Sequence, residues 1–468
     1  MTEYGLNKAI RFIVLSMSAL QLTACANFSA GNLFSHYSAQ NQEVYQAVKR
    51  GDYAAAEQAL PDDIAGDILD NFEKGRVYLL NNNAQQSQSS FELSDQAIRR
   101  EQDKATVSIT DTATSIGSLA VNDNLNIYYP ADYELGFLHL YLGLNYVKEN
   151  KLDDALVEMR RANQVQERAR AERERQLENA QSEMESQGLT PNLGSVLAKY
   201  PDAGKKLQAV QNAYLMYLSA LLYETDGDLN SAYVDYRRAL AVMPDNRAVI
   251  DSTMRTARRL GMSDDLRLLQ KRYGKAQANQ VGKARVIIIQ EQDTVEAMQD
   301  WRLSLPLYDS RGNGALYSLA LPYYAPSQNV TLPPLRLNNS TVQSELLADV
   351  NLMAQQDLSE RMPSIILRQA LRVVAKDRIR KEAASKDDVG NLLFNVWNTL
   401  TEQPDTRSWQ TLPAAVRSSS MMVEAGQQRL DIGGRSYQFS VSEGNTALVW
   451  LSRQGNNATV WHKQLGRL

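Results

Sequence analysis

The 468-residue chain contains one cysteine, three histidines, and neither a glycine-rich phosphate loop nor a Gly-x-Ser-x-Gly nucleophile elbow. One cysteine excludes a disulfide within the chain. His36, His139 and His462 lie in separate regions, which excludes transition-metal sites with the usual spacing of Cys and His ligands. The net charge of −4 argues against a general nucleic-acid-binding protein, which needs a basic excess to neutralise phosphates. We therefore predict no cofactor, no metal and no nucleic-acid partner.

No other signature of catalysis is present, although carboxylates are abundant. A glycosidase needs only two carboxylates, about 5–10 Å apart, and a sequence does not show such a separation. We predict that the protein is not an enzyme and keep a glycan-cleaving enzyme as the minor alternative.

The first 25 residues have the pattern of a cleavable export signal. Lys8 and Arg11 form a positive region, an apolar stretch of eleven residues follows at 12–22, and residues 22–25 read Leu-Thr-Ala-Cys. Eleven apolar residues are too few to span a bilayer core, which needs ~20. The tetrapeptide is similar to a bacterial lipobox, so we predict a lipoprotein in which Cys25 carries palmitate-like acyl chains. The alternative is an ordinary secretory signal with a chance cysteine.

The lipid anchor predicts the location of the mature chain. Several acyl chains on Cys25 hold a protein on a membrane far more firmly than one. Ala26 stands where an inner-membrane retention signal would place aspartate. We therefore expect attachment to the cell outer membrane through the lipid, with the chain facing the periplasm.

Residues 40–275 contain self-similar units that predict pairs of helices. The first helix of each unit carries a small residue and, three positions later, a tyrosine: Gly75 and Tyr78, Gly143 and Tyr146, Ala220 and Tyr223. The second helix carries a small, a large and a small residue: Ser87, Phe91 and Ser94; Ala155, Met159 and Ala162; Ala232, Tyr236 and Ala239. Small residues let two helices approach and large ones fill the groove between units, as in a tetratricopeptide repeat. Plain helical-bundle packing is the alternative.

The clearest units are 136–166 and 213–246. We interpret residues 51–61 as a degenerate first unit and 247–273 as a closing helix pair. Residues 104–130 are rich in Ser, Thr, Asn and Asp and predict a loop or an extended insertion. Residues 163–186 predict a long, charged helix, which is either a solvated face with i,i+4 ion pairs or an arm that touches a partner.

Residues 283–468 differ in composition from the rest, because all five tryptophans and eight of the thirteen prolines lie after residue 300. The pattern predicts helices at 343–360, at 364–385 and at 388–401, and Pro363 separates the first from the second. It predicts strands at 284–290, 316–321, 330–337, 418–424, 428–433, 435–441, 446–452 and 458–463, with hairpin turns at 433–434 and 455–457. The predicted fold class is mainly α: an N-terminal tetratricopeptide-like helical solenoid followed by a smaller α+β domain.

Two sets of residues are candidates for binding a partner. Tyr146, Tyr223 and Tyr236 recur in the repeats, and tyrosine is a good anchor because it buries a large area and keeps a polar tip. Arg368, Arg372 and Lys376 recur every four residues on one predicted helix and could meet anionic glycan, lipid headgroups or an acidic protein. For these cations the alternative is a solvated face paired with nearby acids, or arginines packed against the helical repeats.

Three stretches resemble a known family. They are residues 133–134 with 144–146 and 155–163; Tyr223 with 232–233 and 236–246; and residues 405–409, Asp-Thr-Arg-Ser-Trp, with the Leu-Pro at 412–413. Together they resemble an uncharacterised family of proteobacterial tetratricopeptide-repeat-containing outer-membrane lipoproteins. The resemblance implies location and architecture, with cell-wall assembly as the setting, because members are often encoded beside lipoproteins that activate penicillin-binding proteins. For Arg407 and Trp409 we expect a packed cation–π pair or a core anchor.

The sequence therefore predicts an outer-membrane lipoprotein whose solenoid is a protein-binding scaffold in the cell envelope. Solenoids present an extended concave surface, and the expected partner is an envelope protein. The alternative places the function in the C-terminal domain, as an envelope glycan- or lipid-binding module with the repeats as a spacer.

Overall fold

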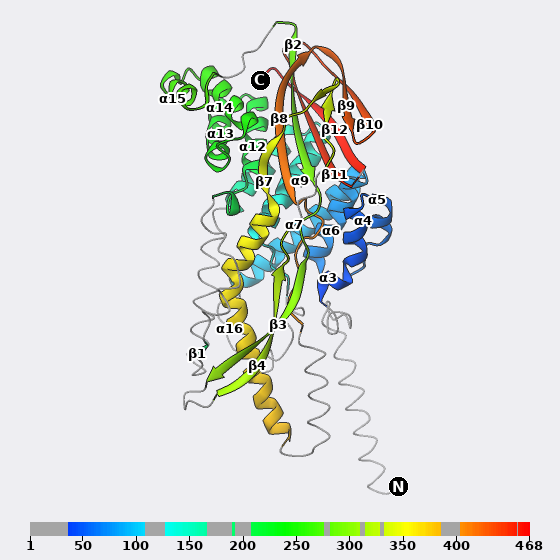
Figure 1. Ribbon diagram of the computed structural model, residues 1–468, viewed down its shortest axis with the longest axis vertical. Coiled ribbons are helices and arrows are strands. Elements are labelled where there is room, and N and C mark those ends of the chain that lie inside the picture. The colour runs from blue at the N-terminus through cyan, green and yellow to red at the C-terminus, as the bar shows by residue number, and fades with distance from the viewer. Residues whose placement is uncertain are drawn as a thin grey trace.

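The computed structural model describes residues 36–107, 127–165, 190–191, 207–275, 281–308, 314–327, 332–384, 403–455 and 457–468 (Figure 1). The predicted signal with Cys25, most of the insertion at 104–130, most of the charged segment at 163–186 and the predicted helix at 388–401 lie outside these residues.

The first half of the chain is an array of helices. It begins with α3 (Tyr37–Gln40), α4 (Gln42–Lys49) and α5 (Tyr53–Gln58). Four pairs follow: α6 (Asp67–Leu80) with α7 (Ala84–Val107); α9 (Asp132–Lys148) with a helix at 152–165; α12 (Ala213–Asp226) with α13 (Leu229–Val242); and α14 (Arg247–Arg259) with α15 (Ser263–Tyr273). A 3₁₀ turn, η4 (Leu207–Ala209), precedes α12. The helix pairs expected at 136–166, 213–246 and 247–273 are confirmed.

The small residues of the repeats are required by close helix contacts. A Cβ atom on Gly75 would lie 2.5 Å from ring carbons of Phe91, and one on Gly143 would lie 2.3 Å from Cε of Met159. Each glycine lies on the first helix of a pair and each large residue on the second. The predicted contact between small and large residues therefore holds the two helices of a pair together.

The second half is built on a five-stranded sheet with the order β12-β11-β2-β8-β7. Its strands are β2 (Lys283–Gln292), β7 (Glu345–Asp349), β8 (Ala415–Glu424), β11 (Thr446–Gln454) and β12 (Asn457–Gly466). Only the β2–β11 pair is parallel. A second sheet, in the order β10-β9-β5-β6, contains β5 (Arg336–Leu337), β6 (Ser340–Thr341), β9 (Gly426–Ile432) and β10 (Arg435–Val441). The Gly433-Gly434 hairpin is confirmed, and both glycines have positive φ.

A long hairpin and a long helix extend away from the five-stranded sheet (Figure 1). The hairpin consists of β3 (Met298–Tyr308) and β4 (Gly314–Tyr324), and β1 (Thr190–Pro191) pairs with β3. The helix is α16 (Val350–Ala384), which packs along β4. The sequence did not predict β3.

The structure corrects two predictions in this region. Residues 345–349 form strand β7, and α16 continues through Pro363 where the sequence predicted a break. Proline in a helix interior costs about 3 kcal/mol, but Leu358, Met362 and Ile366 are buried around it and their packing holds the helix together. The strand expected at 330–337 is reduced to Arg336–Leu337, because prolines 333 and 334 have no N–H to donate to a sheet.

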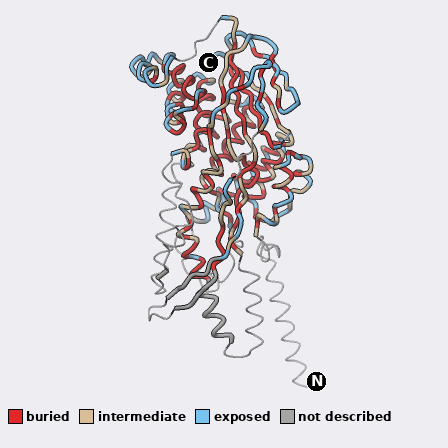
Figure 2. Tube along the Cα trace, viewed as in Figure 1, coloured by how far each residue is buried: buried red, intermediate tan, exposed pale blue. Residues whose placement is uncertain are grey.

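The helix array and the five-stranded sheet share one hydrophobic core. Ile287 and Ile289 on one face of β2 pack in the same cluster as the residues of α6, α9 and α12. Val286 and Ile288 on the other face of β2 pack with the second sheet. Buried residues, red in Figure 2, run from the helices into the strands without a break. The two segments that differ in composition therefore fold against each other.

Candidate functional site

The inner face of the helix array, formed by α6, α9 and α12, is covered by the protein's own C-terminal half. The segment 405–412, which has no regular secondary structure, lies against this face. Trp409 is fully buried there, and its ring stacks on Phe72 with centroids 4.5 Å apart. Phe91 and Tyr141 lie 5.7 and 5.8 Å from it, also between ring centroids. The expected core anchor at Trp409 is confirmed, and it fills the surface that the sequence assigned to a partner.

Two buried carboxylates of the first helices bind the backbone of this segment. Gln410 N–H donates to Glu73 Oε1 at 2.7 Å, and Trp409 N–H donates to Glu134 Oε1 at 2.7 Å. The Thr411 hydroxyl donates to the other oxygen of Glu73 at 2.5 Å. Burial raises the pKa of Glu73 to about 7 and also raises that of Glu134. The helix array thus holds segment 405–412 in place through its backbone N–H groups.

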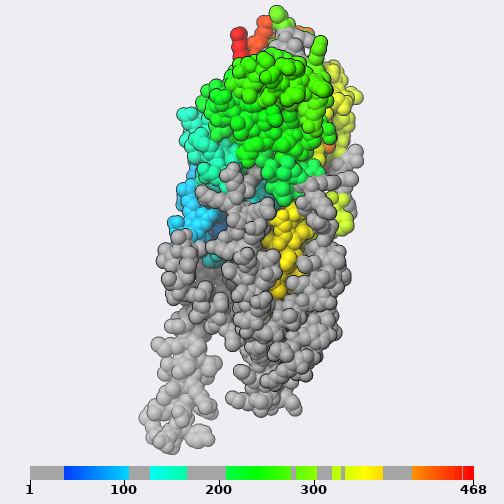
Figure 3. Space-filling view, turned by 90° about the vertical axis from the view of Figure 1, so that its left-hand side faces the viewer, coloured from blue at the N-terminus to red at the C-terminus, as the bar shows by residue number. Residues whose placement is uncertain are grey.

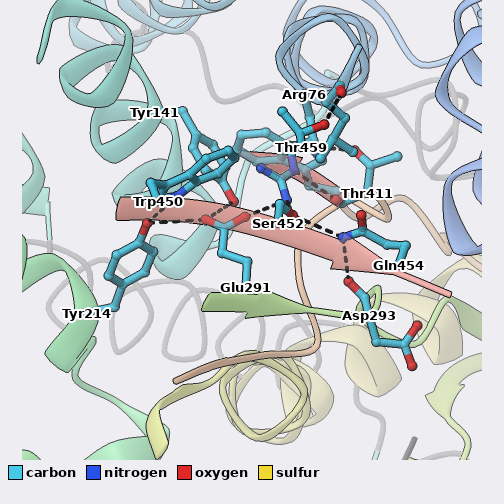
Figure 4. A network of polar contacts seen from close by, with 12 residues as sticks. Arg76, Tyr141, Tyr214, Glu291, Asp293, Thr411, Trp450, Ser452, Gln454 and Thr459 are labelled. Carbon is cyan, nitrogen blue, oxygen red and sulfur yellow. Dashed lines mark hydrogen bonds and ion pairs between the residues drawn. The ribbon is translucent and has the colours of Figure 1, made fainter. Parts of the chain in front are cut away.

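A fully buried ion pair joins the helices to the sheet (Figure 4). Arg76 Nη2 on α6 lies 2.6 Å from Glu291 Oε2 on β2, and neither side chain has any exposed surface. The hydroxyls of Tyr141 and Tyr214 each donate to Glu291 Oε1 at 3.2 Å. Trp450 Nε1 donates to the Tyr214 hydroxyl at 3.0 Å. Burial by itself lowers the pKa of Arg76, but Glu291 together with Tyr141 and Tyr214 outweighs burial, so this pKa is raised above its usual value.

The guanidinium of Arg76 also contacts the C-terminal half directly. Its Nη2 donates to Ser452 Oγ at 2.8 Å, and its Nε donates to the carbonyl oxygen of Thr411 at 3.2 Å. Its Cζ lies 4.7 Å from the ring centroid of Tyr141. Each charge in this network therefore interacts with several partners from different elements. The network links the helix array to the C-terminal half and has a structural role. Within the described ranges, no group of three His, Cys, Asp or Glu residues could hold a metal ion.

The structure separates the three candidate tyrosines. Tyr236 is fully buried and donates to Glu224 Oε2 at 2.8 Å, so it has no surface to offer a partner. Tyr146 and Tyr223 are partly buried against the core, and the hydroxyl of Tyr146 donates to Glu92 at 3.2 Å. The expectation that these tyrosines anchor a partner is therefore corrected for Tyr236, because the large residue of the second helix fills the groove between units.

The basic stripe on α16 is not a single surface. Arg368 is exposed, whereas Arg372 is 6% exposed and engaged by neighbouring groups. The side chain of Lys376 lies outside the described residues. The burial of Arg372 agrees with the alternative in which arginines of this stripe pack against neighbouring elements, while Arg368 stays exposed.

His139 is buried, and its Nδ1 lies 2.7 Å from Glu158 Oε2, so this histidine is satisfied in the core. Arg407 lies over the ring of Tyr128, with Cζ 5.6 Å from the centroid, and its Nη2 is paired with Asp405 Oδ2 at 2.7 Å. The cation–π contact expected at Arg407 is therefore present, and it fixes the start of segment 405–412.

Among the described residues, the outer face of the helix array carries side chains that are exposed to solvent. We use this name for the exposed side of α7, the helix at 152–165, α13 and α15. Figure 3 shows the helix pairs of residues 207–275, in green, forming the surface on one side of the molecule. Residues 155–162 and 232–239 share the pattern Ala-x-Val-acid-x-Arg-Arg-Ala. In both units the valine is exposed: Val157 at 44% and Val234 at 58%. The sequence contained this repeat, but the packing pattern alone did not mark its valines as exposed.

The acidic residue and the second arginine of this pattern form bonds within their helix, and the arginine also contacts the preceding unit. Arg161 bonds Glu158 of its own helix at 3.0 Å and also pairs with Asp95 of α7. Arg238 bonds Asp235 at 3.3 Å and reaches Asn163 of the preceding unit at 3.4 Å. The exposed valines contribute to none of these bonds.

Comparisons with known proteins found similarity to solved structures only. No protein-family model matches it, and no curated protein matches it. Among solved structures it is similar to MamA AMB-1 at 13% identity and a TM-score of 0.27, covering 50% of this chain and 87% of that one. For a crystal structure of MamA protein the identity is 11% and the TM-score 0.29, with 53% of this chain and 100% of that chain covered. For MamA MSR-1 the identity is 14% and the TM-score 0.26, with 50% of this chain and 95% of that chain covered. The tetratricopeptide-like arrangement rests on the helix pairs of the chain itself.

Replacing Arg76 by methionine should lower the free energy of unfolding by about 3–5 kcal/mol, because Glu291 is then buried without its counter-charge. The double variant Arg76→Met/Glu291→Gln should lose less free energy of unfolding than the sum of the losses in the two single variants. Urea denaturation of the three variants measures these losses. Arg267→Met breaks an exposed pair with Asp264 and is the matched control, expected to show little change. Additive effects of the two buried changes would contradict the proposed coupling.

The raised pKa of Glu73 predicts a pH-dependent stability. Because the pKa in the folded state, about 7, exceeds the ~4.3 of an unfolded glutamate, the folded protein binds more protons between these values. The contribution of this group is complete below about pH 4 and is lost as the pH rises through 7. The urea midpoint of the wild type relative to Glu73→Gln should therefore decrease from pH 5 to pH 8. A difference that stays constant or increases would show that Glu73 is not protonated in this range.

Proposed function

We propose that the protein is an outer-membrane-anchored periplasmic lipoprotein that acts as a non-enzymatic protein-binding scaffold in the cell envelope. We further propose that a partner binds to the outer face of the helix array. The observation that carries this assignment is the repeated exposure of Val157 and Val234 at equivalent positions of two successive units. Single exposed apolar side chains are common on protein surfaces, but their recurrence at the same position of successive repeats gives the array a periodic apolar surface that a partner can contact.

The closed inner face supports this choice of surface. Segment 405–412 and the sheet occupy the face on which a solenoid ordinarily binds its partner. Displacing that segment would expose Trp409 and deprive Glu73 and Glu134 of the backbone donors at Gln410 and Trp409. A partner that binds the folded protein therefore has the outer face available and the inner face closed.

The membrane attachment in this proposal depends on the predicted lipid at Cys25. No helix among the described residues is long and apolar enough to cross a membrane. The alternative, a glycan- or lipid-binding module, was based on the basic stripe of α16, and the burial of Arg372 removes one of its three cations from the surface.

Replacing both exposed valines by aspartate should abolish capture of a stoichiometric partner from crosslinked envelopes. The unfolding midpoint should shift little, because surface substitutions usually change stability by less than about 0.5 kcal/mol. Val281→Asp is the matched control, since Val281 is 98% exposed and lies outside the helix array. Partner capture that survives Val157→Asp/Val234→Asp, or is lost equally with Val281→Asp, would rule out the outer face.

Replacing Cys25 by serine should move nearly all of the protein from the membrane fraction to the soluble periplasmic fraction, because the acyl chains lose their attachment point. Ala26→Asp should instead move the lipidated protein to the inner membrane. Density-gradient fractionation of envelopes measures both shifts. A Cys25→Ser protein that remains with the outer membrane would contradict lipid anchoring.

A further inference from the structure

The hairpin of β3 and β4 and the distal half of α16, residues 368–384, extend together from the body of the molecule (Figure 1). We call these elements the arm. Because α16 packs along β4, the helix and the hairpin leave the body on the same side. Helix α3, the first helix of the described chain, lies at the edge of the body from which the arm extends (Figure 1).

The N-terminal end of the described chain is held at the base of the arm. His36 Nε2 lies 3.4 Å from Asp300 Oδ1, near the start of β3. The backbone N–H of Ser38 donates to Thr406 Oγ1 at 3.2 Å. These contacts fix the place at which the chain that leads back to Cys25 leaves the body, and that place is beside β3.

The length of this preceding chain limits how far a membrane that holds Cys25 lies from the arm. Eleven residues separate His36 from Cys25, and fully extended they span at most about 40 Å. Strand β3 continues for eight residues beyond Asp300, to Tyr308, which is about 26 Å at the rise of a strand. A membrane that faces the arm therefore lies at most about 14 Å beyond the end of β3, and closer when the chain is not fully extended.

The distal half of α16 is basic. Residues 368–384 contain six Lys or Arg and two Asp or Glu, a net charge of +4, whereas the whole chain carries −4. Arg368 is exposed and Arg372 is buried, and the other four cations lie between 376 and 381, near the end of the helix. A group of four or more Lys and Arg on a helix beside a membrane is typical of binding to anionic lipid headgroups.

The distal parts of β3 and β4 lack charge. Residues 303–308 and 314–318 contain no Asp, Glu, Lys or Arg, and they include four leucines, Tyr308 and Tyr317. Tyrosine is enriched at membrane–water interfaces, because its ring is apolar and its hydroxyl is polar. The fold therefore brings a basic helix end and an uncharged hairpin to the same end of the molecule, on the side from which the proposed anchor leaves.

We propose that the end of the arm, residues 376–381 with the distal parts of β3 and β4, contacts a membrane surface through anionic lipid headgroups. This inference rests on the proposed lipid at Cys25, which brings the arm to the membrane. The contact is weak by itself, and the short chain before His36 strengthens it by raising the effective concentration of the membrane at the arm. The arm then holds the helix array about 26 Å from the membrane.

Flotation with lipid vesicles tests the contact without the acyl chains, on the full mature chain carrying Cys25→Ser. At low salt and millimolar lipid, the protein should float with vesicles made of equal parts of phosphatidylglycerol and phosphatidylcholine. It should not float with vesicles of phosphatidylcholine alone. Absence of binding to the anionic vesicles, or equal binding to both kinds, would overturn the proposal.

Charge removal from the end of α16 shows which cations act. Arg378→Gln/Arg380→Gln/Lys381→Gln should weaken binding to the anionic vesicles at least about tenfold, because three cations near the headgroups are lost. Glutamine is a good helix former, so α16 should persist. The matched control, Arg267→Gln/Lys271→Gln/Arg272→Gln, removes the same charge from exposed positions of α15 and should change binding little. Equal losses in the two triple variants would contradict a contact through the arm.

A polarity-sensitive dye reports which end of the molecule meets the vesicle. Cys25→Ser removes the only cysteine of the chain, so Ala383→Cys or Asp264→Cys provides a single labelling position. The dye at 383, near the end of α16, should become brighter when the anionic vesicles are added. The dye at 264, on α15, should not change. A response at 264 equal to that at 383, or no response at 383, would overturn the proposed orientation.

These measurements separate the arm from the lipid anchor. The vesicle contact is weak and decreases with salt, so it does not hold the Cys25→Ser protein on membranes during density-gradient fractionation. Fractionation therefore reports the anchor at Cys25, and vesicle binding reports the arm.

Discussion

The ion pair between Arg76 and Glu291 is the constraint on which the rest of the structure depends. Two charges without exposed surface are tolerated only when their partners are in place, and here the partners come from three first helices and two strands. An Arg76 without the sheet, or a Glu291 without the helices, would be a buried charge without compensation. The helix array and the sheet therefore have to assemble together, which agrees with their shared core.

This assembly changes how the solenoid is used. In an open solenoid the inner face is free for a ligand, whereas here Trp409 and the backbone of 409–411 occupy it. The carboxylates of Glu73 and Glu134 accept from backbone and hydroxyl donors of a segment that belongs to the same chain. The repeats thus act as a framework that folds around the C-terminal half.

The sequence predicted what depends on local pattern. Glycine opposite Phe91 or Met159 follows from spacing within one unit, and the Gly433-Gly434 hairpin follows from turn chemistry. It did not predict the buried network, because Arg76 and Glu291 are 215 positions apart and a charged residue is ordinarily interpreted as exposed. Arg372 shows the same difficulty on α16, where periodicity places cations on one face but does not reveal which neighbours cover it. Strand β3 was missed although apolar and polar residues alternate along 301–307, which is the period of a strand; Pro306 inside the run argued against one.

The repeated pattern at 155–162 and 232–239 divides structural from exposed positions. The acid and the second arginine have a structural reason to recur, since they bond within the helix and to the unit before. The valine has none, because it is exposed in both units and a β-branched residue lowers helix propensity slightly. An alanine or lysine would satisfy the helix better at both positions. Helix stability therefore does not account for the two valines, and their recurrence is the reason that the proposed partner surface is the outer face and not the closed inner one.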